Sequence, residues 1–134
     1  MDVRVMADRE QIRSAVRELC QRFPERYWRE MDEARRYPEE FVRALTEAGW
    51  LSVLIPEDFG GAGLGTFEAG VVLEEINRSG GSAAACHAQM YTMGALLRHG
   101  SEEQKRRWLP AIAAGELRLQ SFGVTEPDAG SDTT

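Results

Sequence analysis

Apolar residues recur at three- and four-residue spacing along most of the chain, the pattern of helices that bury one face. In the first such stretch, Ile12, Val16, Leu19 and Phe23 form one stripe, and Pro24 follows it. Because proline cannot continue a helix, we expect the first helix to run from about residue 8 to residue 23.

The segments that follow also read as helices, each bounded by proline or glycine. Ser101 and Gln104 mark the clearest start, because their side chains can cap each other's backbone N–H groups. In the helix before it, many small residues allow close packing, which predicts a central position. The expected helices are 25–36 (short and exposed), 38–49, 66–80, 82–100 and 101–115, with a glycine-rich loop at 57–65.

In the segment 66–80 the pattern divides the residues between two faces. Val72 and Ile76 belong to the apolar face, whereas Glu74, Glu75 and Arg78 are expected on the opposite, solvent-facing side. The sequence therefore predicts an amphipathic helix here.

After Gly115 the period changes from about 3.6 to two. Arg118, Gln120, Phe122 and Val124 alternate with the residues between them, which predicts a strand over 117–124. A single strand is not stable alone in water, so we expect the functional unit to include more sequence or another chain. The predicted fold is mostly α: a helical, up-and-down domain over 1–116, with a terminal β-strand that starts a truncated β domain over 117–134.

Charge and composition exclude several classes of function. The formal net charge is -6 and the basic residues are scattered, which argues against nucleic-acid binding. The longest apolar run is shorter than the ~18 residues that span a bilayer, so we expect no membrane insertion and a cytoplasmic location. Cys20 and Cys86 lie on apolar helix faces and are expected to be buried structural thiols.

One segment has residues suited to a ligand. Thr125 supplies a hydroxyl at the end of the predicted strand, and the N–H groups of Gly130 and Ser131 can form a small anion-binding nest. Such groups could hold a heteroaromatic, phosphate-bearing ligand. The alternative is an ordinary solvent-exposed loop, and the residue spacing alone does not decide between them.

Three ordered motifs resemble the acyl-CoA dehydrogenase family over essentially the whole chain. The most specific is Phe122-Gly-Val-Thr-Glu-Pro-Asp-Ala-Gly-Ser-Asp132. The others are Gly49-Trp-Leu-Ser-Val-Leu-Ile-Pro-Glu-Asp-Phe-Gly-Gly61, and His99-Gly-Ser-Glu-Glu-Gln-Lys105 with Trp108-Leu-Pro110 and Gly115-Glu116. The resemblance implies an N-terminal helical domain, a middle β-barrel domain that begins in 117–134, and a C-terminal helical bundle.

The resemblance also implies roles for individual residues. Positions matching Phe122, Val124 and Thr125 contact the isoalloxazine ring of FAD, and those matching Gly130 and Ser131 help to bind FAD, with Ser131 also near the CoA moiety. His87 and Tyr91 would line the bottom of the cavity for the acyl chain. A lone helical histidine can instead be a hydrogen-bonded core residue, and that alternative stays open for His87. Neither His87 nor His99 has companions at metal-ligand spacing.

For the whole protein, the resemblance implies an oxidoreductase of fatty acid metabolism. Its substrate would be an acyl-CoA, its electron acceptor an electron-transfer flavoprotein, and its assembly a homodimer or homotetramer. The catalytic base is expected outside these residues, with Glu126 as a structural carboxylate beside Pro127. We therefore expect the 134-residue chain to be inactive alone.

Two other functions remain possible at this point. The apolar helix faces could belong to a non-catalytic module that binds a partner protein. The chain could also be part of a related flavoenzyme of the same fold, such as a nitroalkane oxidase or a flavin-dependent hydroxylase. The Thr125-Glu126-Pro127 and Gly130-Ser131-Asp132 elements favour the dehydrogenase.

Overall fold

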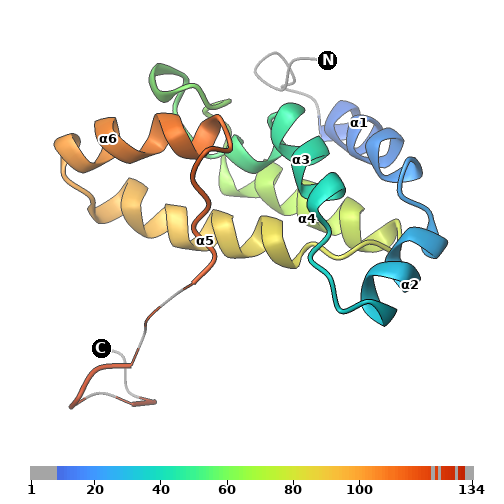
Figure 1. The fold of residues 1–134 in the computed structure, drawn as a ribbon. Helices are drawn as coiled ribbons and strands as arrows, with labels where there is room; N and C mark the ends of the chain where they lie inside the picture. Colours follow the sequence, from blue (N-terminus) through green and yellow to red (C-terminus); the bar gives the residue numbers. More distant parts are fainter. Residues whose placement is uncertain (1–8, 122, 124, 129, 132–134) are drawn as a thin grey trace.

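Helices form nearly all the regular structure of the computed structural model, which describes residues 9–121, 123, 125–128, 130 and 131. Figure 1 shows their arrangement. This confirms the prediction of a mostly α fold. Along the described chain the elements are α1 (Arg9–Gln21), α2 (Glu25–Glu33), α3 (Glu39–Glu47), the short 3-10 helices η2 (Trp50–Ser52) and η3 (Glu57–Phe59), α4 (Thr66–Arg78), α5 (Ala84–His99) and α6 (Glu102–Ala113).

The main core lies where α1 packs along α4 and where α3, η2 and α5 close over that pair. From α1 the predicted stripe is buried, with Ile12 and Val16 fully inaccessible. Phe41 and Trp50 add the largest side chains of this core. Burying a large apolar side chain contributes about 1.5 to 3 kcal/mol, so each of these residues stabilises the helical body.

The turn between α3 and η2 depends on Gly49. Its φ is 81°, in the left-handed region that residues with a Cβ rarely adopt. The N–H of Gly49 donates to the carbonyl of Thr46, which ends α3 and turns the chain into η2. The sequence therefore places this glycine where the turn requires it.

A second core cluster joins α6 to α5. It contains Ile55, Met93, Leu109 and Ile112, all buried. The start of α6 has the predicted capping box: Ser101 Oγ accepts from the Gln104 N–H at 3.2 Å, and Gln104 Oε1 accepts from the Ser101 N–H at 2.8 Å. The prediction for this helix start is confirmed.

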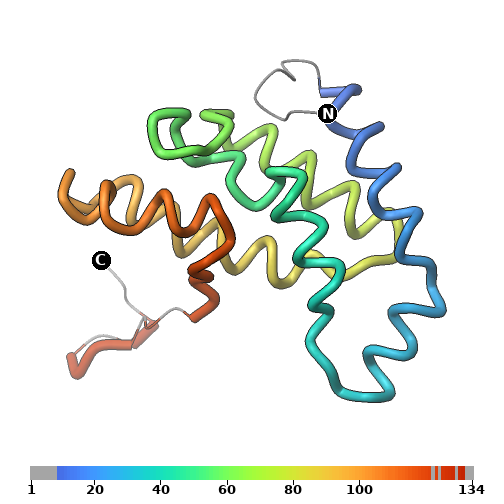
Figure 2. The backbone as a smooth tube through the Cα atoms, turned by 45° about the horizontal axis from the view of Figure 1, so that its top comes forward, coloured from blue at the N-terminus to red at the C-terminus, as the bar shows by residue number. Residues whose placement is uncertain are grey.

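The segment after α6 differs from the prediction. Residues 117–121 and 123 form no strand, and positions 122 and 124 of the predicted strand lie outside the described residues. A strand needs ladder hydrogen bonds to a neighbouring strand, and the helices beside this segment offer no such edge. Figures 1 and 2 show the segment crossing α5 and then leaving the helical body.

Cys20 and Cys86 are both buried and free, as expected for structural thiols. Within the described part of the chain, the helices are too short or too polar to cross a bilayer.

Candidate functional site

Two aromatic side chains project from the exposed side of α5. His87 and Tyr91 lie one helical turn apart, with ring centroids 5.0 Å apart and planes inclined by 57°. Tyr91 is 41% exposed, and His87 is exposed as well. The structure therefore does not support the alternative that His87 is a core residue. It does bring the two predicted substrate residues together.

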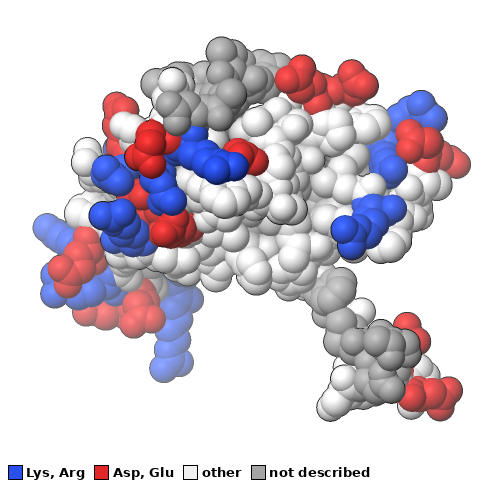
Figure 3. All heavy atoms as spheres, turned by 180° about the vertical axis from the view of Figure 1, so that it is seen from behind, with Lys and Arg blue, Asp and Glu red and all other residues white. Residues whose placement is uncertain are grey.

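The stretch of sequence that carries this pair is uncharged. From Ser79 to Leu97 the chain contains no Lys, Arg, Asp or Glu. Small residues, Ala84, Ala88 and Ala95, lie on or beside the same side of α5. Figure 3 shows a face of the described molecule on which charged side chains gather at the two ends and leave a broad uncharged area between them. Such a surface can be buried without removing charges from water.

The opposite side of α5 is held in place by a residue that the sequence did not single out. Gln89 is 1% exposed, and its Nε2 donates to the backbone carbonyl of Leu51 in η2 at 3.2 Å. This bond fixes α5 against η2 and so fixes the position of the exposed pair. The sequence does contain a signal for this role: Gln89 is a polar residue that lies between Cys86 and Met93 on the buried side of the helix.

The candidate flavin-binding residues lie on another part of the molecule. Thr125, Gly130 and Ser131 are exposed on the segment beyond the helical body, whereas Phe122 and Val124 lie outside the described residues. A Cβ on Gly130 would meet no atom within 4 Å. Side-chain hydroxyls and the backbone N–H groups beside a glycine can donate hydrogen bonds to the phosphates of a cofactor. The chemistry of these residues therefore fits FAD. The structure does not place them beside His87.

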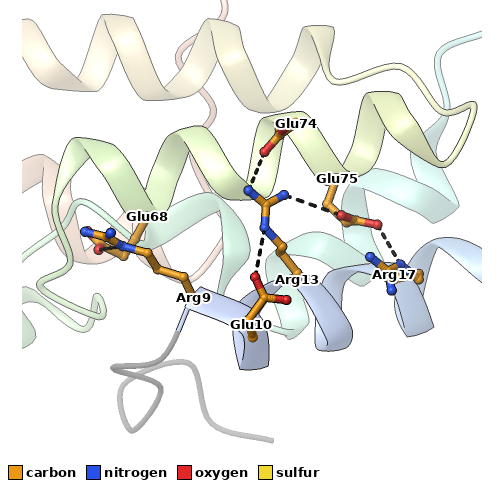
Figure 4. Close-up of polar contacts among 7 residues, drawn as sticks. All are labelled: Arg9, Glu10, Arg13, Arg17, Glu68, Glu74 and Glu75. Carbon is orange, nitrogen blue, oxygen red and sulfur yellow. Dashed lines mark hydrogen bonds and ion pairs between the residues drawn. The ribbon is translucent and has the colours of Figure 1, made fainter.

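An ion-pair network joins α1 to α4, as Figure 4 shows. At its centre is Glu75, which is 1% exposed. Arg17 donates to its carboxylate at 2.7 Å, and Arg13 lies 3.7 Å away. The hydrogen bond from Arg17 lowers the pKa of Glu75 below its ordinary value, although burial opposes the shift. The expectation that Glu75 faces solvent is therefore wrong.

The ion pairs of this network hold α1 against α4 and do not form a catalytic site. Arg13 pairs with Glu74 at 2.6 Å, and Arg9 pairs with Glu68 at 3.4 Å while its guanidinium stacks over the Phe67 ring. A general base needs a raised carboxylate pKa, whereas arginine lowers it here. Among the described residues, no three His, Cys, Asp or Glu side chains gather at a site that could hold a metal ion.

Comparisons with known proteins agree with the motifs. The family model described as "Acyl-CoA dehydrogenase, N-terminal domain" matches residues 6–116. The probable acyl-CoA dehydrogenase FadE25 of Mycobacterium tuberculosis is 40% identical over 127 residues, which is 93% of this chain and 32% of the relative. The short-chain specific acyl-CoA dehydrogenase of Clostridium acetobutylicum is 30% identical over 135 residues, which is 99% of this chain and 35% of the relative.

Solved structures show the same similarity to acyl-CoA dehydrogenases. The chain superposes on the glutaryl-coenzyme A dehydrogenase in complex with glutaryl-CoA with a TM-score of 0.79 and 32% identity, covering 99% of this chain and 35% of that one. It also resembles a chain in a structure of the electron transferring flavoprotein of Acidaminococcus fermentans, with a TM-score of 0.78, 28% identity, and coverage of 99% and 35%. The chain spans about a third of the length of the curated relatives it matches. It belongs to the acyl-CoA dehydrogenase family, in which it corresponds to the N-terminal domain.

Proposed function

We propose that the chain forms the N-terminal helical wall of an FAD-dependent acyl-CoA dehydrogenase. The whole protein would remove hydrogen from the α- and β-carbons of an acyl-CoA thioester. The observation that carries this proposal is the family match over residues 6–116. The Thr125-Glu126-Pro127 and Gly130-Ser131 elements beyond that match support it.

The terminal segment would contribute to the flavin site. The exposed hydroxyls of Thr125 and Ser131 can hydrogen-bond to FAD, and Gly130 leaves room for the cofactor to come close to the backbone. Phe122 and Val124 are proposed as flavin contacts from the motif alone. FAD, when bound, supplies the acceptor for the hydride that leaves the β-carbon. In the whole protein, residues 117–134 would begin the middle β-barrel domain, whose strands would pair with 117–124.

The exposed side of α5 would contribute to the acyl site. His87 and Tyr91 lie together on an uncharged stretch of α5, and we propose that they line the far end of the acyl cavity, with Ser131 near the CoA moiety. The rest of the protein would cover this surface and supply the catalytic base. Glu126 is not proposed as that base, because it lies beside Pro127 in the flavin motif.

Partners of the whole protein follow from the same proposal. An electron-transfer flavoprotein would accept the electrons, and a homodimer or homotetramer would be the assembly. The cytoplasmic location stays a prediction.

The first experiment uses the full-length protein that carries this sequence. We expect it to purify with bound FAD and its visible flavin absorption to bleach when an acyl-CoA is added without an electron acceptor. A colourless full-length protein that binds no added FAD would contradict the proposal. A protein that binds FAD but is not bleached by any acyl-CoA would favour the related flavoenzymes. The 134-residue chain alone should show no turnover.

A second experiment tests the acyl site in the same full-length protein. His87→Ala and Tyr91→Ala shorten the side chains at the proposed cavity end, so kcat/KM for longer acyl chains should rise about tenfold relative to shorter ones, since one methylene is worth about 10- to 200-fold. His99→Ala, at the exposed end of the same helix, is the control and should leave the preference unchanged. An unchanged preference in both cavity variants would contradict the assignment.

A further inference from the structure

The exposed side of α5 presents an imidazole that makes no hydrogen bond within the part of the chain that the structure describes. His87 contacts the ring of Tyr91, but no hydrogen bond joins either ring nitrogen to another described residue. The polar side chains that follow on the helix already donate: Gln89 to a carbonyl of η2, and Thr92 to the carbonyl of Ala88 at 2.8 Å. The imidazole therefore has hydrogen-bonding capacity that the helical body does not use.

The surface beside this imidazole has room for a ligand. Gly94 lies about two turns beyond His87 and, at 100° per residue, within about 20° of it around the helix. A Cβ on Gly94 would meet no atom within 4 Å. The next charged residue along α5 is Arg98, about 16 Å from His87 at 1.5 Å per residue. An acyl chain along this side of α5 would therefore meet small groups and the imidazole, with no charged α5 side chain beside it.

His87 needs a hydrogen-bond partner once this surface is covered. In the proposed function the rest of the protein closes over the exposed side of α5, which removes the imidazole from water. Whether neutral or protonated, a histidine ring has at least one N–H donor. A buried donor without an acceptor costs more free energy than a satisfied hydrogen bond gains. The end of an alkyl chain offers no acceptor, whereas an oxygen atom on the chain does.

We propose that the preferred substrate is an acyl-CoA whose far end carries a neutral oxygen, in a hydroxyl or a carbonyl group, and that His87 is the specificity-determining residue that hydrogen-bonds it. This inference rests on the proposed function, because it takes the exposed side of α5 as the far end of the acyl cavity. A terminal carboxylate is disfavoured, because α5 offers it no Lys or Arg at this place and burying an unpaired charge is costly.

The test uses the full-length flavoprotein and pairs of acyl-CoAs of similar shape. Each pair compares an ω-hydroxyacyl-CoA with the alkyl acyl-CoA in which a methyl group replaces the hydroxyl, such as ω-hydroxyhexanoyl-CoA and heptanoyl-CoA. Pairs built on butyryl, hexanoyl and octanoyl chains vary the reach toward His87, and adipoyl-CoA supplies a terminal carboxylate. The readout is kcat/KM with an artificial electron acceptor. Each preference is a ratio measured on one preparation, so a partly folded variant does not distort it.

The variants separate hydrogen bonding from the shape of the side chain. His87→Leu and His87→Phe remove both nitrogens, and the second keeps a ring beside Tyr91. His87→Gln keeps an N–H donor. His99→Leu is the matched control, because it makes the same change at the exposed end of the same helix.

At the chain length that reaches His87, wild type should prefer the hydroxyacyl-CoA by about two- to tenfold, the range for gaining one neutral hydrogen bond. Wild type should use adipoyl-CoA less well than ω-hydroxyhexanoyl-CoA. In His87→Leu and His87→Phe the preference should reverse toward the alkyl chain by about tenfold, because the hydroxyl then loses water without a partner. His87→Gln and His99→Leu should keep the wild-type preference for the hydroxyl.

Wild type that uses each alkyl acyl-CoA as well as its hydroxy partner, at every length, would overturn the inference and leave the proposed function intact. A preference for the hydroxyl that survives in both apolar variants of His87 would show that another residue makes the bond. A preference for adipoyl-CoA would reject the neutral end group. A full-length wild type that oxidises no acyl-CoA would instead reject the proposed function, and the inference with it.

Discussion

Arg17 Nε donates a 2.7 Å hydrogen bond to Glu75 Oε1, which joins the partly exposed surface of α1 to a carboxylate that is 1% exposed in α4. The pKa of Glu75 is lowered despite its burial, so the ionised form is favoured in the folded protein. The contact therefore stabilises the packing of α1 on α4, the most extensive helix pairing of the main core.

Replacing this carboxylate by an amide of the same shape should destabilise the fold. We expect Glu75→Gln to lower the free energy of unfolding by about 1.5 to 3 kcal/mol, the range for a hydrogen bond to a charged group. Urea denaturation at pH 7 measures it. Glu74→Gln is the control, because Glu74 also pairs with an arginine but its side chain is 58% exposed, and its change should be much smaller. Equal effects of the two substitutions would contradict the buried pair.

The same carboxylate gives a pH dependence. Because the pKa of Glu75 is lower in the folded than in the unfolded chain, its stabilisation is fully present above the unfolded pKa, near 4.5, and is lost as the pH falls through the folded pKa. The difference in unfolding free energy between wild type and Glu75→Gln should therefore shrink from pH 6 to pH 3. Other carboxylates, Glu68 among them, remain in both proteins, so their titration cancels in the difference. A difference that stays constant down to pH 3 would contradict the assignment.

Local signals predict most of this fold. The helix start at Ser101 depends on a reciprocal cap within four residues, and the end of α3 depends on one glycine at 49. Both signals are read without any tertiary information, which is why they were predicted correctly. The stripe of α1 is equally local, because a helical period needs only the chain itself.

Features that depend on distant residues were not predictable in the same way. At 100° per residue, Glu75 lies only 60° from Val72 around α4, so it borders the apolar stripe, and the arginines of α1 decide whether it is buried. The predicted strand over 117–124 needs an edge that the described helices do not offer. At the candidate site, the pairing of His87 and Tyr91 follows from their i, i+4 spacing. Outside that site, the bond from Gln120 to Tyr37 spans 83 positions and has no sequence signal.

Two glycines should respond to alanine with opposite signs. Gly115, just beyond α6, has a φ of 77°, and a Cβ there would lie 2.4 Å from Thr46 Cγ2. The left-handed backbone alone costs about 1 to 2 kcal/mol, so Gly115→Ala should destabilise by at least that amount. In α4, Gly70 has open space around a Cβ, and Gly70→Ala should stabilise by about 0.5 to 1 kcal/mol. Urea denaturation of both variants measures the effects.

The Thr46 side chain separates strain from steric overlap at Gly115. Thr46→Ala removes the Cγ2 atom that a new Cβ would meet, and it leaves the positive φ unchanged. Gly115→Ala should therefore cost less in the Thr46→Ala background than in wild type, without falling to zero. An identical cost in both backgrounds would show that the overlap is relieved by a shift of the backbone.

The two thiols should react at different rates in the folded protein. Burial raises the pKa of Cys86 to about 12, and its side chain is packed against Met90 on the inner side of α5. Burial also raises the pKa of Cys20, but a hydrogen bond with Ser79 opposes the shift, and Cys20 lines a cavity of about 370 Å³ between the ends of α1 and α4. Because the thiolate is the nucleophile, iodoacetamide at pH 8 should modify Cys20 first and leave Cys86 intact.

Single-cysteine variants make this assignment testable by mass spectrometry. Cys86→Ser should keep the faster reaction of the native protein, and Cys20→Ser should abolish it. In urea above the unfolding transition, the remaining thiol of either variant should react at the same rate, because both then have ordinary pKa values and full access. Reaction at a buried thiol requires local opening of the structure. If Cys86 reacted as fast as Cys20 in native buffer, α5 would separate from the core more often than its buried contacts with η2 allow, and the assignment would be contradicted.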